Sequence, residues 1–278
     1  MNNLYKEAGL SKQAVVQYNK RQKIFDKKVE QVVLEADELR EDHPGCGEEK
    51  MYHTLKPDFI GRDRFIELMM ELGYRLKRKK NYRKTTIASK LYYPNLIKGM
   101  QVNRPSMIWQ SDITYIPIGD KHYYAVFIID VYSKKIVGYK VSDNMRAQAN
   151  MDALHMALKE NDAPLIHHSD RGSQYTYKDY ISLLKLNGSK ISMALSAQDN
   201  AFAERINRTI KEEYLDHWKP KSFNQLKRMT DKAVMNYNTK RLHNNNGRKC
   251  PKDFINQFSL IRPNQRKLMT IFNNEMIN

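Results

Sequence analysis

Residues 107–117 read MIWQSDITYIP, and this stretch decides the fold. Apolar and aromatic side chains alternate through it well enough to predict a β-strand, which Pro117 is expected to end. Asp112 lies in the middle of that strand, beside apolar and aromatic neighbours. A carboxylate is costly to bury in a sheet, so it needs a hydrogen-bond partner or a cation. The stretch therefore predicts a strand that also carries a functional group.

The sequence that follows predicts a mixed sheet. Stretches 122–132 and 135–142 complete an antiparallel meander, and 165–169 and 190–195 are expected to be short parallel strands. The expected helices are 146–160, 177–186, 200–218 and 222–243. Three antiparallel strands followed by alternating helices and parallel strands predict an α/β fold, with a mixed five-stranded sheet flanked by helices. We expect this core domain to span 107–258, with a C-terminal tail over 259–278.

Residues 1–95 are expected to form an all-α DNA-binding region. A short helix at 4–8, a turn, and a helix from the capping residue Ser11 through Tyr18 have the spacing of a helix-turn-helix. Other short helical hairpins share this spacing. No sustained heptad repeat is evident. Further helices are expected at 29–41, 47–55 and 62–72, followed by a linker at 96–106.

A basic run, Leu76–Lys84, follows the last of these helices. Its composition also suits an ordinary solvated loop. Because it comes directly after a helical pair, we expect it to contact DNA phosphates. The residues expected to do so are Lys77, Arg78, Lys79 and Lys80.

Charge and composition narrow the class of protein. The formal net charge is +17, and the isoelectric point is near 9.6. Residues 1–100 carry a net +7, 101–200 a net +1 and 201–278 a net +9, so polyanions are the expected partners. No apolar run approaches the roughly 18 residues that a membrane span needs, and no secretory leader is evident. The two cysteines form no Cys-x-x-Cys pair, so we expect a cytoplasmic protein without disulfides or structural zinc.

Three acids occupy positions that suit catalysis. Asp170 follows a predicted parallel strand, where open α/β sheets place their ligands, and Glu204 lies one turn into the helix after the last strand. Together with Asp112 they would supply hard oxygen ligands from three separate elements. Two Mg²⁺ or Mn²⁺ ions about 4 Å apart, held in this way, activate the attacking oxygen and stabilise the leaving oxygen in phosphodiester cleavage. Taken singly, each acid also has an ordinary explanation, such as a hydroxyl contact, a turn or an ion pair with Arg208.

Three motifs in this order resemble those of integrase-core transposases. They are WQSDITY at 109–115, HSDRGSQY at 168–175 and DNAFAE at 199–204. The resemblance covers roughly residues 45–258, with the core firmest, and is closest to bacterial insertion-sequence transposases encoded by two overlapping frames, of which this resembles the downstream product. The piece Gly61–Lys80 resembles the helix-turn-helix that precedes the core in this group.

The resemblance implies a ribonuclease-H-like fold of the retroviral integrase superfamily and a DDE-type polynucleotidyl transferase. Asp112, Asp170 and Glu204 would hold two Mg²⁺ or Mn²⁺ ions. Water or a DNA 3′-hydroxyl would attack phosphorus in line, without a covalent protein–DNA intermediate. The implied function is cleavage and strand transfer, that is, transposition and DNA integration.

The helix that carries Glu204 is amphipathic. Phe202, Ile206, Ile210 and Tyr214 recur on one side and are expected to pack on the sheet. The other side carries Glu204, Asn207, Arg208 and Lys211. We expect Asn207, Arg208 and Lys211 to face DNA, and a basic residue seven positions after the glutamate matches the group. An exposed salt-bridge face is the alternative for Arg208.

Two departures from the group concern the segment before Glu204. Thirty-three residues separate Asp170 from Glu204, a couple fewer than is usual, and Ser196-Ala197-Gln198 replaces a Gly/Cys-containing segment. A shortened loop before the helix would accommodate both differences. Within the second motif, His168 is expected to support the site.

Two other functions keep the same charge pattern or fold. One is a non-catalytic DNA-binding regulator of transposition, and the other is a nuclease or junction resolvase. The expected partners are double-stranded DNA, at element ends and target, and further copies of the chain in an oligomer on DNA. An upstream-frame helix-turn-helix and zipper protein is a further expected partner. No membrane partner is expected, and the place of action would be the bacterial nucleoid.

Overall fold

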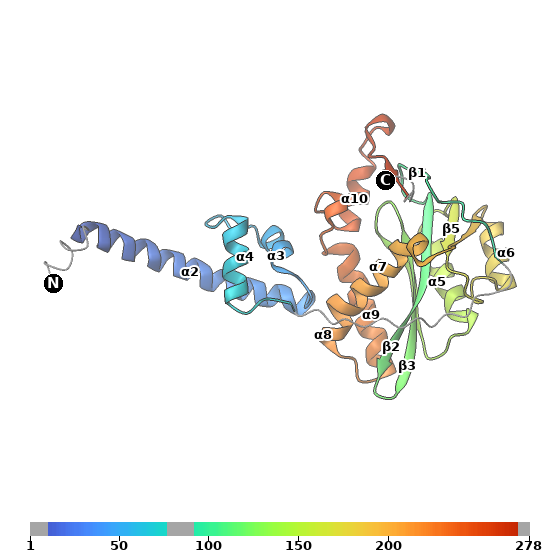
Figure 1. Ribbon diagram of the computed structural model, residues 1–278, viewed down its shortest axis with the longest axis horizontal. Helices are drawn as coiled ribbons and strands as arrows, with labels where there is room; N and C mark the ends of the chain where they lie inside the picture. The colour runs from blue at the N-terminus through green and yellow to red at the C-terminus, as the bar shows by residue number, and fades with distance from the viewer. Residues whose placement is uncertain (1–10, 77–91, 272–278) are drawn as a thin grey trace. The chain divides into compact units, whose positions relative to one another are not determined.

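The structure is a computed structural model that describes residues 11–76 and 92–271 (Figure 1). The chain divides into two compact units, 1–78 and 79–278. The expected helix at 4–8 and the basic residues Lys77, Arg78, Lys79 and Lys80 lie outside the described residues. Among those that are described, no helix is both long and apolar enough to cross a bilayer.

The first unit is all-α. It contains α2 (Lys12–Asp42), α3 (Glu48–Leu55) and α4 (Arg62–Glu71), which pack around Met51, Phe65 and Met69. The expected helices at 47–55 and 62–72 are confirmed as α3 and α4. Their six-residue connection begins at Lys56, which adopts a left-handed conformation.

The expectation of two separate helices before residue 42 is wrong. Ser11 caps α2 by accepting a hydrogen bond from Ala14 N, as its sequence position suggests, but the helix continues without a break to Asp42. No glycine or proline interrupts it. Within this single helix, apolar side chains do recur at alternating intervals of three and four residues, broken once by a glutamine. The positions are 15, 18, 22, 25, 29, 32, 36 and 39.

The second unit contains the expected five-stranded mixed sheet, in the order β4-β3-β2-β5-β6. Its strands are β2 (Ile108–Ile118), β3 (Lys121–Asp130), β4 (Ile136–Ser142), β5 (Ile166–Ser169) and β6 (Lys190–Met193). The first three form an antiparallel meander, and β5 and β6 are parallel to β2. This is a ribonuclease-H-like arrangement, and every strand expected after residue 106 is present with its ends shifted by at most a few residues.

Pro117 does not end β2, contrary to expectation. It pairs with His122 of β3, whereas β5 pairs with β2 only over 108–111. The side of β2 that faces away from β3 is therefore free of a strand partner at Pro117, where the missing N–H costs no ladder hydrogen bond.

Helices cover both faces of the sheet. On one face lie α5 (Ala147–Glu160) and α6 (Lys178–Leu186), and on the other α7 (Ala201–Ile210) and α9 (Phe223–Thr239) (Figure 1). Alternate residues of β3 divide between the two cores, with Val126 and Ile128 toward α5 and Phe127 and Ile129 toward α7. A Cβ at Gly138 of β4 would lie 2.2 Å from the carbonyl oxygen of Ala153, so α5 approaches β4 more closely than any side chain would allow.

The helix expected over 200–218 has three parts. A five-residue π-helical segment, Lys211–Leu215, separates α7 from α8 (Asp216–Trp218). The segments expected to be linker and tail also contain structure. Within them, β1 (Gln101–Val102) pairs with β7 (Met269–Thr270), beside α10 (Pro251–Phe258), and Val102 and Ile271 are buried there.

Candidate active site

Asp112 lies on the face of β2 that is covered by α7. Side chains alternate along a strand, so Gln110 and Asp112 share this face while Ser111 points to the other. The contacts agree: Asn207 Nδ2 of α7 donates to Asp112 Oδ2 at 2.8 Å, and Ser111 Oγ lies 3.0 Å from Tyr175 Oη on the opposite side. The acid of the first motif therefore sits between the sheet and the helix that carries Glu204.

Asp112 is held in an environment that disfavours its charge. Burial, together with the charges of Asp170 and Glu204, raises its pKa to about 8. Hydrogen bonds from the Ile113 backbone and from Asn207 lower the pKa but do not offset burial.

Asp170 follows the end of β5, next to Asp112. The parallel register pairs Ser111 with Ser169, so the residues after each are brought to the same level of the sheet. Gly172 N donates to Asp170 Oδ1 at 3.0 Å, and a Cβ at Gly172 would lie 3.0 Å from that oxygen. Burial raises the pKa of Asp170, and the Gly172 hydrogen bond lowers it. The glycine of the second motif thus permits a tight turn that fixes this carboxylate.

Glu204 comes from the first turn of α7. Burial raises its pKa, Arg208 lowers it, and the charge of Asp170 raises it. A carboxylate near a helix N-terminus is also stabilised by the helix dipole.

Every pair within Asp112, Asp170 and Glu204 interacts electrostatically, and each of the three pKa values is raised. In the described part of the chain, however, no three His, Cys, Asp or Glu side chains are grouped closely enough to surround one metal ion. The donor set nevertheless fits a hard divalent cation, because all three side chains offer carboxylate oxygens and their negative charges repel one another. The side chains would need to draw closer to share an ion.

Asp199, the other acid of the third motif, stabilises the turn before α7. Its Oδ2 accepts hydrogen bonds from Leu195 N and Ser196 N, each at 2.9 Å, and closes a capping box around the 3-10 helix Ala197–Asn200. Burial raises its pKa, but the hydrogen bonds from Ser196 and Leu195 outweigh this and lower it. The replaced loop segment is therefore a compact turn that leads directly into α7.

His168, expected to support the site, is fully buried on the strand that leads to Asp170. Its Nδ1 lies 2.8 Å from Ser192 Oγ of β6. Burial lowers its pKa to about 4, against the raising effect of Asp199, so the ring is neutral near pH 7. His168 on β5 is therefore a neutral side chain that contacts β6 through Ser192 and the turn through Asp199.

Tyr175 belongs to the site's surroundings, although the sequence did not single it out. It is 1% exposed, and its hydroxyl contacts Ser111, the neighbour of Asp112. Burial raises its pKa well above the usual value, and the charges of Asp170 and Asp112 add to that shift. Its place in the HSDRGSQY motif was the one available signal.

Comparison with known proteins identifies the family. Residues 102–197 and 189–251 each match an integrase core domain. The chain is 33% identical over 207 residues to the insertion element IS600 uncharacterized 31 kDa protein of Shigella sonnei, covering 72% of this chain and 76% of that protein. It is 36% identical over 189 residues to the transposase for insertion sequence element IS904 of Lactococcus lactis, covering 66% and 73%. The chain belongs to the insertion-sequence transposases.

Among solved structures, the transposase is similar to the HTLV-2 integrase catalytic core domain in complex with magnesium. The sequence identity is 18% and the TM-score is 0.45, over 54% of this chain and 97% of that one.

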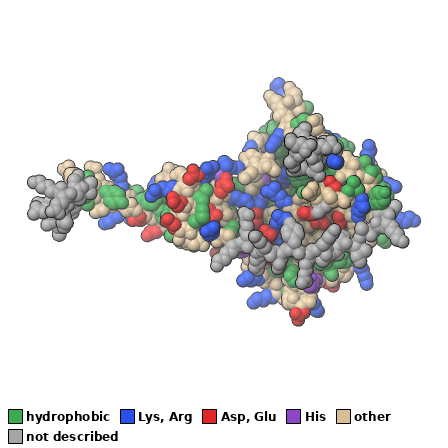
Figure 2. All heavy atoms as spheres, viewed as in Figure 1, with side chains coloured by type: hydrophobic (Ala, Val, Ile, Leu, Met, Phe, Trp, Pro, Cys, Tyr) green, Lys and Arg blue, Asp and Glu red, His purple; other side chains and the backbone are tan. Residues whose placement is uncertain are grey.

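The polar side of α7 divides into an inner and an outer part. Arg208 is exposed and Lys211 is partly exposed, whereas Asn207 is 6% exposed and bonded to Asp112. The position of Asn207 differs from the exposed one expected from helical periodicity. Lys and Arg side chains are spread over much of the visible surface of the transposase (Figure 2).

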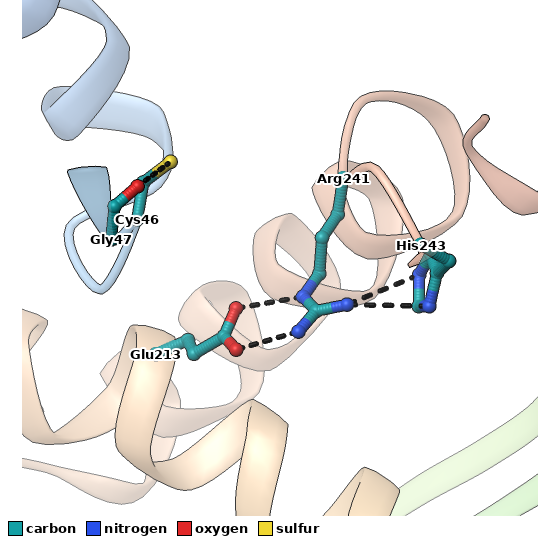
Figure 3. A network of polar contacts seen from close by, with 5 residues as sticks. All are labelled: Cys46, Gly47, Glu213, Arg241 and His243. Atoms are coloured by element: carbon teal, nitrogen blue, oxygen red, sulfur yellow. Dashed lines mark hydrogen bonds and ion pairs between the residues drawn. The ribbon is translucent and has the colours of Figure 1, made fainter. Parts of the chain in front are cut away.

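A partly buried ion pair holds the end of this helical region. Arg241 Nε and Nη2 donate to the two carboxylate oxygens of Glu213 at 2.7 and 2.6 Å, and Arg241 Nη1 approaches His243 (Figure 3). Glu213 lies in the π-helical segment, and Arg241 follows α9. The bidentate pair therefore ties the continuation of α7 to α9 just beyond Lys211.

Proposed function

We propose that the chain catalyses metal-dependent DNA cleavage and strand transfer for an insertion sequence in a bacterial cytoplasm, with Asp112, Asp170 and Glu204 as the catalytic carboxylates. One observation supports this most directly. Three acids from a strand, a strand end and a helix bring their charges together, and burial and repulsion raise the pKa of each. Such an arrangement is costly without a bound cation.

The three carboxylates would hold two Mg²⁺ or Mn²⁺ ions, whose chemistry is to activate the attacking oxygen and to stabilise the leaving one. The chain's own groups prepare this site. Asn207 holds Asp112 by a hydrogen bond to Oδ2, and the Gly172 N–H holds Asp170. In the reaction, water or a DNA 3′-hydroxyl forms a bond to phosphorus as the opposite P–O bond breaks.

DNA would be bound by basic side chains at both ends of the chain. Arg208 of α7 and Lys211 at the start of the π-helical segment both follow Glu204, and they suit phosphates next to the reacting one. Lys77, Arg78, Lys79 and Lys80 remain candidate phosphate contacts, and the α3–α4 pair is a candidate DNA-reading element. We also propose that several copies assemble on element ends and target, alone or with an upstream-frame partner.

A cleavage and strand-transfer assay tests the proposal. Asp112→Asn, Asp170→Asn and Glu204→Gln should each reduce Mg²⁺-dependent cleavage and joining by at least about a thousand-fold, and DNA affinity should change little. Asp120→Asn, an exposed acid in the β2–β3 turn, is the matched control and should keep full activity.

The products separate the remaining functions. Joined products support a transposase, whereas cut products alone would indicate a nuclease or resolvase. DNA binding without cleavage by the wild-type chain, or activity that survives all three substitutions, would leave a non-catalytic regulator as the better description.

A further inference from the structure

The helix that carries Glu204 begins without a cap from its own sequence. Asn200 is at the N-cap of α7, but its side chain makes no capping hydrogen bond. The first backbone N–H groups of a helix have no acceptor within the helix, and they need one when they are buried. The acceptor here comes from another element.

Gln110 of β2 supplies it. Its Oε1 accepts from Phe202 N at 3.1 Å and from Ala203 N at 3.3 Å, and its Nε2 donates to Asp199 O at 3.2 Å. Gln110 is 0% exposed, so water does not compete for these bonds. One end of the amide thus caps α7 at Phe202, 92 residues away in the chain, and the other end holds the turn that precedes the helix.

Asn200 completes a reciprocal contact. Its Nδ2 donates to Ser111 O at 3.0 Å, and the residue is 2% exposed. Two amide side chains therefore connect the start of α7 to residues 110 and 111 of β2. These contacts lie immediately before Asp112 on the strand and immediately before Glu204 on the helix.

We propose that Gln110 is a positioning residue that fixes Glu204 relative to Asp112. The proposal rests on the proposed function, in which both carboxylates hold cations. A helix capped by its own loop would take its position from that loop. Here the strand that bears one carboxylate directly contacts the start of the helix that bears another, in addition to the turn at Ser196–Asp199.

The test compares Gln110→Met with Ser189→Ala. Methionine keeps the length of the side chain and removes all three hydrogen bonds. Ser189→Ala removes a buried hydrogen bond to Pro164 O, which measures 2.7 Å and lies just before β6, at the opposite end of β5 and β6 from Asp170. It is therefore a control for loss of stability alone. Each variant is measured as the full chain, for thermal unfolding without metal, for the Mn²⁺ concentration that gives half of the maximal thermal stabilisation, and for DNA affinity.

We expect Gln110→Met to raise that Mn²⁺ concentration by about ten- to a hundred-fold, the effect usual for residues that orient metal ligands, with DNA affinity unchanged. Ser189→Ala should lower the unfolding temperature and leave the Mn²⁺ requirement as in the wild type. In a Glu204→Gln background, Gln110→Met should add no further loss of Mn²⁺ affinity, because it acts through Glu204.

Other outcomes overturn the proposal. An unchanged Mn²⁺ requirement in Gln110→Met, or an equal additional loss in the Glu204→Gln background, would make Gln110 a structural residue only. If Gln110→Met does not fold, Asn200→Ala removes the reciprocal bond to Ser111 and should show a smaller shift in the same direction. No stabilisation of the wild type by Mn²⁺ would instead contradict the proposed function itself.

Discussion

At the scale of single residues, the buried carboxyl of Asp112 makes the stability of the folded protein depend on pH. Its pKa is raised from 3.8 to about 8 by burial and by neighbouring acids. Without metal, the folded state therefore binds a proton that the unfolded state has released, and stability is lost as pH rises from about 4 toward 8. Asparagine has the same shape and can still accept the hydrogen bond from Asn207.

We therefore expect metal-free Asp112→Asn to be more stable than the wild type at pH 7.5, by at least about 1 kcal/mol, or several degrees in unfolding temperature. The difference should disappear below about pH 3, where Asp112 is protonated in both states. Thermal unfolding in a chelator across this range measures it. Equal unfolding temperatures of the two proteins at pH 7.5 would show that folding does not raise the pKa of Asp112.

The three acids could be predicted from the sequence, because each lies in a short motif with its own spacing. Gln110 and Asn207 could not be assigned their roles in the same way. Their partners are 92 and 95 residues distant in the chain, and only the packing of α7 on β2 brings them together. Helical periodicity placed Asn207 on the polar side of the helix, but it could not show that Asn207 is buried against Asp112.

At the scale of elements, local patterns predicted each strand of the five-stranded sheet. Features that depend on a distant partner were missed. The strands β1 and β7 have two residues each, which is too few for any periodicity. Pro117 stays within β2 because β5 is too short to reach it, a fact that the local sequence does not contain. In α2, two local patterns suggested two helices, although nothing in the sequence between them ends a helix.

The ion pair between Glu213 and Arg241 connects the π-helical segment after α7 to the end of α9. Arg241 and Glu213 have side-chain exposures of 12% and 23%, so removing one partner leaves the other largely buried and uncompensated. We expect Glu213→Gln and Arg241→Met each to lower the free energy of unfolding by about 3 kcal/mol, the lower part of the range for buried pairs.

The double variant should lose much less than the two single losses added together, because it leaves no unpaired charge. Urea unfolding of all four proteins provides this comparison. If the double variant loses the sum of the two single losses in unfolding free energy, the ion pair does not help to hold α9 against the end of the α7 region.

At the scale of the whole molecule, the positive charge is concentrated in the two end segments of the chain. The nearly neutral middle segment contains Asp112 and Asp170, and the basic segments lie on either side of it. The second unit, residues 79–278, has its own cores on both faces of the sheet and contains all three proposed catalytic acids. Everything that the proposed cation site needs is therefore present in this unit.

A fragment of residues 79–278 should accordingly fold alone, with a cooperative thermal transition. Mn²⁺ should stabilise it to the same extent as the full chain, since the ligands and the Gln110 contacts are intact. Its affinity for element ends should fall by at least about ten-fold, because the α3–α4 pair and the two basic residues 77 and 78 are lost and each phosphate contact contributes to binding. Circular dichroism and DNA titrations at matched salt measure both effects. Full end-specific affinity in the fragment would place recognition in the second unit and leave the helical unit with another task.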